Sequence, residues 1–175
     1  MSTPFAWTLS APEDRTQLKD FEVGGNGPQF VSAGQDRSRI CARYFVGDPE
    51  GTIVGHVHFG DRAQGPPGFA HGGALASVRD ELMGIAAWQQ DLDVVAAELT
   101  LKYRQPTPLW TELVLSAWVD RIEGRRAYIQ SHVALPDGTV CCEGSGIFVN
   151  IGKDKYREFI KNAASRKAKS ADGSV

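Results

Sequence analysis

The amino-acid sequence predicts an α+β fold in which one long helix is wrapped by a curved antiparallel sheet of about five to six strands. Three observations lead to this prediction. One segment of helical periodicity follows two strand-like segments and precedes four more. The turns between the strand-like segments are too short for the crossovers that parallel strands require. Because one helix covers only one face of such a sheet, the sheet has to curve around it.

The N-terminal part of the chain predicts a loop region followed by a β-hairpin. Residues 1–36 form an N-terminal extension of mixed composition, in which a short helix is expected around residues 13–21. Two strands follow at Ser38–Val46 and Thr52–Phe59, where β-branched and aromatic residues concentrate. Gly, Asp, Pro and Glu make up the residues between them, which is typical of a turn. We therefore expect these two strands to pair.

The central segment predicts one long helix over residues 72–90. Leu75, Val78, Leu82 and Ile85 recur with a period near 3.6 residues, which marks one buried stripe. A helix with a single apolar stripe packs that side against a neighbouring layer. This helix is therefore expected to face the concave side of the sheet.

The second half of the chain predicts four further strands joined by hairpin turns such as Pro136–Gly138. They are expected at Val94–Tyr103, Thr111–Arg121, Arg126–Leu135 and Thr139–Ile151. In the second of these, apolar residues alternate with more polar ones, as in a half-buried strand. Residues 37–151 are thus expected to form one domain. Residues 152–175 are expected to form a basic, flexible C-terminal tail with one helical turn near residues 156–160.

Composition argues for a cytoplasmic protein and against two classes of partner. A chain of 175 residues with 42% hydrophobic content suits one domain. Its net charge of −2 gives no support for nucleic-acid binding, and no run approaches the ~20 apolar residues of a membrane span. The N-terminus lacks the basic start and apolar stretch of a secretory signal. Cys41, Cys141 and Cys142 lack metal-type spacing and predict reduced, mostly buried thiols.

The most informative motif lies where the central helix is expected to begin. A Pro/Gly-rich loop leads to His71, Gly72 and Gly73, and a carboxylate follows at Asp80. The first N–H groups of a helix have no internal partner, and the helix dipole adds partial positive charge there. Glycines at this place let a ligand approach the backbone closely. The combination suits an acyl oxygen that becomes negative during nucleophilic attack.

The spacing within this motif indicates a site shared between two copies of the chain. His71 and Asp80 are nine residues apart, which on a helix is about 13 Å of rise and roughly half a turn. The two ends of one helix would therefore not reach the same small group. Two helices packed antiparallel about a twofold axis would bring the N-terminus of one beside Asp80 of the other.

These residues resemble the hotdog-fold thioesterases, and within them the phenylacetate-degradation type of acyl-CoA thioesterase. The resemblance spans roughly Thr52 to Asn150 and rests on His-Gly-Gly, the Asp nine positions after the His, and the later segment Leu-Thr-Leu-Lys-Tyr-Arg-Gln-Pro at 99–106. It implies a homodimer or homotetramer. It also implies hydrolysis of an acyl-CoA or acyl-carrier-protein thioester to the free acid and thiol, with no cofactor.

The resemblance assigns roles to the residues of the motif. The family's backbone donor to the thioester oxygen falls on Gly72, with Gly73 beside it. Its loop histidine is His71, and its catalytic carboxylate is Asp80, contributed by the partner subunit. Asp80 would either activate water or attack the carbonyl directly to give a mixed anhydride, and the sequence does not choose between these.

Four residues near the motif are candidates for substrate binding: Gly73, Ser77, Glu81 and Ala96. Glu81 directly follows the catalytic carboxylate, where relatives often carry a second acid. Ala96 stands where several relatives carry a Ser or Thr that orients the carboxylate or the attacking water. Without that hydroxyl, positioning of the water is weaker. Ser77 and Thr100 are the candidates to compensate.

Two other functions stay open at this point. A hotdog-fold hydratase or dehydratase would use an Asp and a His as an acid–base pair on an enoyl thioester. A non-catalytic acyl-thioester-binding module would bind the substrate without releasing a thiol. His56 and His58 face the same side of a strand but have no third ligand nearby in sequence, so no metal is expected. Arg79, Arg104 and the basic tail are candidates to contact the phosphates of coenzyme A.

Overall fold

A computed structural model describes residues 6–13, 15–18, 30–31, 36–47 and 51–171 of the chain. Much of the N-terminal extension therefore lies outside the described residues, including part of the short helix expected around residues 13–21. In the described part of that segment the prediction is wrong, because residues 15–18 are not helical. Gln17 instead forms an isolated antiparallel bridge with Phe45.

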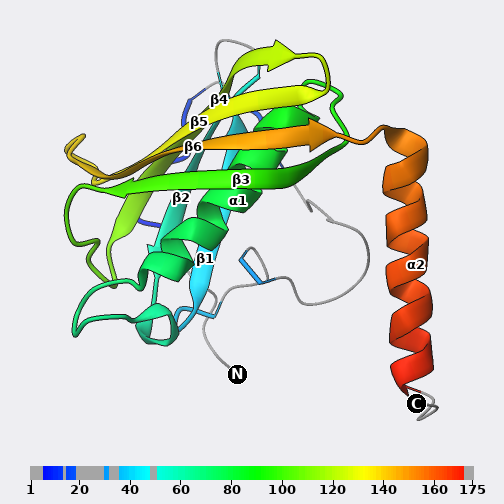
Figure 1. Ribbon diagram of the computed structural model, residues 1–175. Coiled ribbons are helices and arrows are strands. Elements are labelled where there is room, and N and C mark those ends of the chain that lie inside the picture. The colour runs from blue at the N-terminus through cyan, green and yellow to red at the C-terminus, as the bar shows by residue number, and fades with distance from the viewer. Residues whose placement is uncertain (1–5, 14, 19–29, 32–35, 48–50, 172–175) are drawn as a thin grey trace.

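Six strands and two α-helices make up the described fold (Figure 1). Their bounds are β1 Ile40–Val46, β2 Thr52–Phe59, α1 Gly72–Trp88, β3 Val94–Tyr103, β4 Glu112–Glu123, β5 Arg126–Ala134, β6 Val140–Asn150 and α2 Lys153–Ala171, with a short 3-10 helix, η1, at Asp61–Ala63. The strands form one antiparallel sheet in the order β1-β2-β4-β5-β6-β3. The strands and the helix match the predicted segments within a few residues.

The sheet curves around α1, which lies across its concave face (Figure 1). The predicted stripe of Leu75, Val78, Leu82 and Ile85 is buried. It packs in one core with inward side chains of the strands, such as Leu113 of β4. This arrangement is the hotdog fold, as predicted. β3 takes an edge of the sheet because it pairs only with β6.

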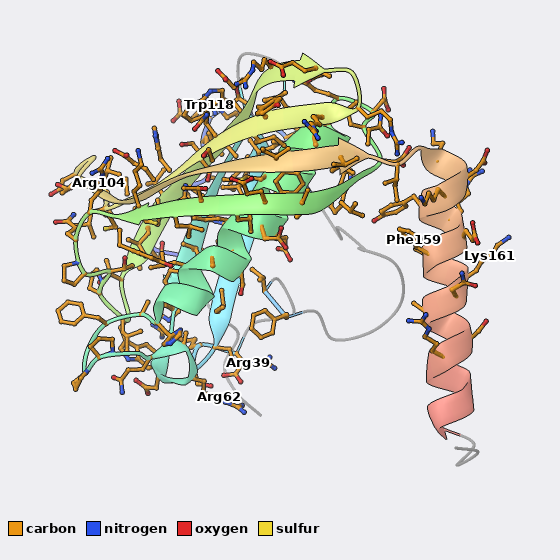
Figure 2. The ribbon with its side chains drawn as sticks, viewed as in Figure 1. Arg39, Arg62, Arg104, Trp118, Phe159 and Lys161 are labelled. Carbon is orange, nitrogen blue, oxygen red and sulfur yellow. The ribbon has the colours of Figure 1, made fainter. Side chains whose placement is uncertain are left out.

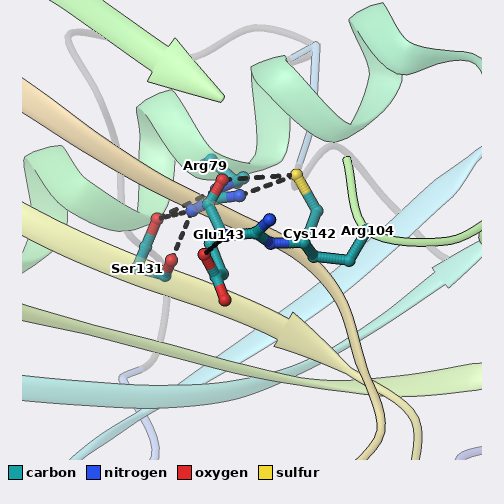
Figure 3. Close-up of polar contacts among 5 residues, drawn as sticks. All are labelled: Arg79, Arg104, Ser131, Cys142 and Glu143. Atoms are coloured by element: carbon teal, nitrogen blue, oxygen red, sulfur yellow. Dashed lines mark hydrogen bonds and ion pairs between the residues drawn. The ribbon is translucent and has the colours of Figure 1, made fainter. Parts of the chain in front are cut away.

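A buried arginine ties α1 to the inner face of the sheet (Figure 3). Arg79 is 0% exposed and donates hydrogen bonds to the hydroxyl and carbonyl oxygens of Ser131 on β5. Its guanidinium also lies 2.8 Å from Sγ of Cys142 on β6. Gly144 leaves the necessary space, since a Cβ there would come within 2.5 Å of the guanidinium. These contacts fix the height and rotation of α1 against β5 and β6.

The C-terminal segment forms a longer helix than the sequence suggested. One turn was expected near residues 156–160, whereas α2 spans 19 residues. Gly152, with φ of +78°, turns the chain out of β6 just before the helix begins. Acidic Asp154 in the first turn then suits the helix dipole. Figure 1 shows α2 standing clear of the sheet.

No helix of the described part of the chain is long and apolar enough to cross a lipid bilayer. The three cysteines are free and buried, as predicted.

Candidate active site

The candidate site begins at the N-terminus of α1, where His71 caps the helix. His71 has extended backbone angles, φ −65° and ψ 139°, and its Nδ1 accepts a hydrogen bond from the N–H of Gly73 at 2.9 Å. A neutral imidazole that accepts at Nδ1 carries its proton at Nε2. The cap therefore leaves a proton on Nε2, which can act as a donor. It also uses the Gly73 N–H, which the sequence had grouped with that of Gly72.

The N–H of Gly72 is the donor left over at this helix start. It has no acceptor among the residues that the structure describes. On the other side of the same residue, the hydroxyl of Tyr103 donates to the Gly72 carbonyl at 3.0 Å. A Cβ at Gly72 would lie only 3.0 Å from that hydroxyl oxygen. Tyr103 at the end of β3 thus holds the first turn of α1, a role that its place in the 99–106 segment did not reveal.

The loop before the helix is held by backbone hydrogen bonds. The N–H of His71 donates to the carbonyl of Ala63 in η1 at 2.8 Å, and that of Ala70 donates to Thr107 at 2.9 Å. Within the loop, the N–H of Gly68 donates to the side-chain oxygen of Gln64 at 3.1 Å. Because both sides of the loop are anchored, the Pro/Gly-rich segment places His71 at a defined position.

An open cavity of about 580 Å³ lies at this end of α1. His71 and Gly73 line it together with Ser77, whose hydroxyl donates to the Gly73 carbonyl at 2.8 Å. Ala74 of α1 also lines it. The remaining lining residues come from η1, the loop, the start of β1 with the residue before it, and the N-terminal extension: Phe30, Arg39, Ile40, Arg62, Ala63 and Gln64. The cavity thus combines apolar side chains with two cations and the helix N-terminus.

Asp80 lies two turns further along α1 and does not line this cavity. Its side chain is on the exposed side of the helix in the single chain and has no hydrogen-bond partner among the described residues. Protein atoms around the carboxyl nevertheless withdraw water from it, and this burial raises its pKa above the ordinary value. Ala96 on β3 is also exposed and does not line the cavity. One chain therefore groups His71, Gly73 and Ser77 and leaves Asp80 apart from them.

Glu81, the other acidic candidate, is turned toward β1. Its Oε1 accepts a hydrogen bond from the hydroxyl of buried Tyr44 at 2.8 Å. Burial and the neighbouring Glu81 carboxylate raise the pKa of Tyr44 well above 10. This contact gives Glu81 a place in the packing between α1 and β1, and it does not line the cavity.

The arginines and histidines singled out in the sequence have other partners. Arg79 is buried in the core, so the expectation that it meets coenzyme A phosphates is wrong. Arg104 forms an ion pair with Glu143 at 2.7 Å. His58 is buried with its Nε2 3.1 Å from the carbonyl of Arg37, and Nδ1 of His56 accepts from Arg43.

Fold and site together define a hotdog-fold protein whose central helix begins at a capped His-Gly-Gly turn beside a cavity. Known proteins of this class match the chain. Residues 67–142 match the Thioesterase superfamily. The acyl-coenzyme A thioesterase THEM4 of Rattus norvegicus is 31% identical over 141 residues, which are 80% of this chain and 61% of that protein.

Solved structures agree on the fold. A crystal structure described as a thioesterase superfamily protein is 31% identical, with a TM-score of 0.59 over 62% of this chain and 53% of that one. The PaaI protein of E. coli, from the phenylacetic acid degradation operon, is 20% identical, with a TM-score of 0.58 over 65% of this chain and 80% of that one. The second likeness concerns the fold alone. The chain spans about three fifths of the length of its THEM4 relative.

Proposed function

We propose that the protein is a thioesterase that hydrolyses an acyl-CoA or a related acyl thioester to the free acid and the thiol. The observation that carries this proposal is the N–H of Gly72, which has no acceptor among the described residues and lies at a helix N-terminus whose neighbouring N–H is already used by the His71 cap. One unsatisfied donor at the positive end of a helix is suited to a carbonyl oxygen that gains negative charge. The similarity to an acyl-coenzyme A thioesterase supports the same chemistry.

The reaction needs two groups that act on opposite sides of the thioester carbonyl. The Gly72 N–H binds the carbonyl oxygen, and the Nε2–H of His71 is a second donor beside it. Asp80 removes a proton from an attacking water, or attacks the carbonyl carbon itself to form a mixed anhydride that water then hydrolyses. In both routes the tetrahedral intermediate collapses with cleavage of the C–S bond, and the departing thiolate takes up a proton.

The environment of Asp80 suits the role of a base. Burial raises the pKa of its carboxyl, and a base whose pKa lies closer to the working pH accepts a proton more readily. The charged carboxylate is the active form. As the pH falls through this raised pKa, the carboxylate is protonated and activity is lost, so the acid limb of the kcat/KM profile should lie above the ordinary Asp value.

We further propose a homodimer in which Asp80 of one subunit serves the Gly72 of the other. The nine-residue separation and the position of Asp80 outside the cavity support this arrangement. β3 supports it as well, because this edge strand exposes Ala96, Ala97 and Glu98 in succession, which means that neither of its faces is covered there. Open edges of this kind are normally paired or protected. A tetramer of two such dimers and a cytoplasmic location remain parts of the proposal.

The test is release of free thiol from short, long and aromatic acyl-CoA esters by the wild type and the Asp80→Asn variant. We expect turnover by the wild type and a loss of about 10²–10⁴-fold in kcat for the variant, as for removal of a general base. Asp120→Asn is the matched control, since Asp120 is exposed on β4 and pairs with Arg121. A folded Asp80→Asn protein with wild-type turnover would refute the assignment.

One observation favours a second candidate, a non-catalytic acyl-thioester-binding module. Ala96 provides no hydroxyl at the position where several hotdog thioesterases hold the water, and Ser77 uses its own hydroxyl on the Gly73 carbonyl. Saturable acyl-CoA binding without thiol release would select this alternative.

A change in enoyl absorbance would instead select a hydratase. Substrates from the aromatic panel also test the phenylacetate-degradation branch, and acyl-carrier-protein thioesters are tried in parallel.

A further inference from the structure

Two arginines lie together on the wall of the cavity at the start of α1 (Figure 2). Arg39 directly precedes β1, and Arg62 belongs to η1. Backbone hydrogen bonds fix both segments against each other. The N–H of Arg62 donates to the carbonyl of Ser38 at 2.7 Å, and that of Gly60 donates to the carbonyl of Arg39 at 2.8 Å. The two side chains are therefore presented from one rigid corner of the molecule.

Neither guanidinium is neutralised by an ion pair within the described parts of the chain. Two other exposed arginines differ in this respect, since Arg104 pairs with Glu143 and Arg121 pairs with Asp120 and Glu123. The carboxylate of Asp36 interacts electrostatically with both arginines. Hydrogen bonds from Ser38 lower the pKa of Asp36, and the charges of Arg62 and Arg39 lower it further. Asp36 itself does not line the cavity.

The start of the helix lines the same cavity. His71, Gly73 and Ser77 contribute to its wall, as does the apolar side chain of Ile40. A ligand that fills the cavity thus meets the helix start, apolar side chains and two positive charges. Guanidinium groups bind phosphate and carboxylate oxygens through paired, charge-assisted hydrogen bonds.

We propose that Arg39 and Arg62 form an anion-binding subsite that holds a negatively charged oxygen group of the thioester substrate. The group is either a phosphate of the coenzyme A portion or a carboxylate at the far end of the acyl chain. This inference rests on the proposed function, because it places the thioester at the helix start. It also replaces Arg79 and Arg104 as candidates, since the first is buried and the second is paired with Glu143.

The experiment compares the wild type with an Arg39→Gln/Arg62→Gln double variant on three thioesters of the same acyl length. The first is an acyl-CoA, the second the corresponding acyl-pantetheine, which has no phosphate, and the third an acyl-pantetheine with a terminal carboxylate. If the anion is a phosphate, KM rises about tenfold or more for acyl-CoA alone, with kcat nearly unchanged. If it is the carboxylate, KM rises for the carboxylated acyl-pantetheine and not for the neutral one.

Two outcomes would overturn the subsite, namely no change for any thioester or an equal change for all three. Arg121→Gln is the matched control. Arg121 lies at the other end of the sheet from Arg39. It follows the part of β4 that pairs with Thr52 at the start of β2, whereas the start of β1, next to Arg39, pairs with Phe59 at the end of β2. Calorimetric binding of coenzyme A and of a dicarboxylate separates this inference from the proposed function. Suppose that the wild type hydrolyses no thioester but binds the anion, and that the double variant does not bind it. The subsite then stands and the thioesterase proposal fails.

Discussion

At the scale of single residues, the start of α1 shows how one side chain selects which backbone group remains free. His71 adopts extended angles and turns its ring back to accept the Gly73 N–H. This satisfies one of the unpaired donors that every helix N-terminus has. The Gly72 N–H stays without an acceptor among the described residues. The capping of Gly73 thereby concentrates the proposed oxyanion contact on Gly72.

This assignment predicts different effects for two substitutions at Gly72. Proline has no N–H, yet it fits the first position of a helix, and the extended angles of His71 suit a residue that precedes proline. Gly72→Pro should therefore lower kcat by about 10²–10³-fold, as loss of one oxyanion donor does. Gly72→Ala adds a Cβ near the Tyr103 hydroxyl but keeps the N–H. Tyr103 is 55% exposed and can move aside, so this variant should retain most of its turnover.

Thiol-release kinetics on both variants provide the measurement, with circular dichroism to verify folding. Similar losses for the two variants would mean that the Cβ and not the N–H is responsible, which would contradict the assignment.

Some of these residue roles could be predicted from the sequence and others could not. The His-Gly-Gly motif and its spacing to Asp80 are local, so the pattern alone located the helix start. Which of the Gly72 and Gly73 N–H groups is capped depends on the side-chain conformation of His71, and a sequence motif does not specify that conformation. The role of Glu81 could not be predicted either, because its hydrogen bond with Tyr44 joins residues 37 positions apart in the sequence. The catalytic roles themselves stay predictions.

At the scale of elements, α1 is held in register by a polar anchor inside an apolar core. Arg79 is fully buried, and its guanidinium donates hydrogen bonds to Ser131 and to the Cys142 sulfur (Figure 3). Burial lowers the pKa of Arg79, which expresses the cost of removing a cation from water. A buried group of this kind is tolerated only when its hydrogen bonds are made. Asp80 is the next residue, so the same anchor sets the position of the proposed base.

Two glycine-to-alanine substitutions, one beside the Arg79 anchor and one within α1 away from it, should have opposite effects on stability. A Cβ at Gly144 would lie 2.5 Å from the Arg79 guanidinium and 2.8 Å from the backbone oxygen of Thr100. Gly144→Ala should therefore destabilise the protein by about 1–3 kcal/mol, as overpacking does. Gly84 lies inside α1, and its nearest contact would be Trp88 at 3.6 Å. Gly84→Ala should stabilise the protein by roughly 1 kcal/mol through helix propensity.

Thermal unfolding at one fixed protein concentration measures both variants, since an oligomer's melting temperature depends on concentration. A melting temperature for Gly144→Ala equal to that of the wild type would show that the space around Arg79 is not needed.

The elements themselves were the most predictable level of the structure. Alternation in β4 and the 3.6-residue stripe of α1 report directly on burial, so their types and bounds followed from the sequence. The length of α2 did not, because its charged composition carries no strong apolar period and resembles that of a tail. Arg79 was also misplaced, since an arginine is usually exposed and only the sheet behind it provides Ser131 and Cys142 as partners.

At the scale of the whole molecule, one copy of the chain does not bring together the two halves of the proposed site. The start of α1 lines the cavity through His71 and Gly73, next to Gly72, and Asp80 lies further along on the exposed side of the helix. The sheet ends in β3, an edge that exposes three successive residues. A twofold axis beside this edge would cover it and bring the two helices together antiparallel.

A shared site can be tested by mixing two inactive proteins. In a heterodimer of Asp80→Asn and Gly72→Pro subunits, one site contains both substitutions and the other contains neither. Subunits mixed in equal amounts, after dissociation and reassociation, should therefore recover about a quarter of wild-type activity, because half of the dimers are mixed and each has one intact site. If each chain instead used its own Gly72 and Asp80, every site would keep one defect and the mixture would stay inactive. Mixing two portions of Asp80→Asn in the same way is the control, and it should recover nothing. Recovery by the mixed pair would establish at once that the site is composite and that both residues belong to it.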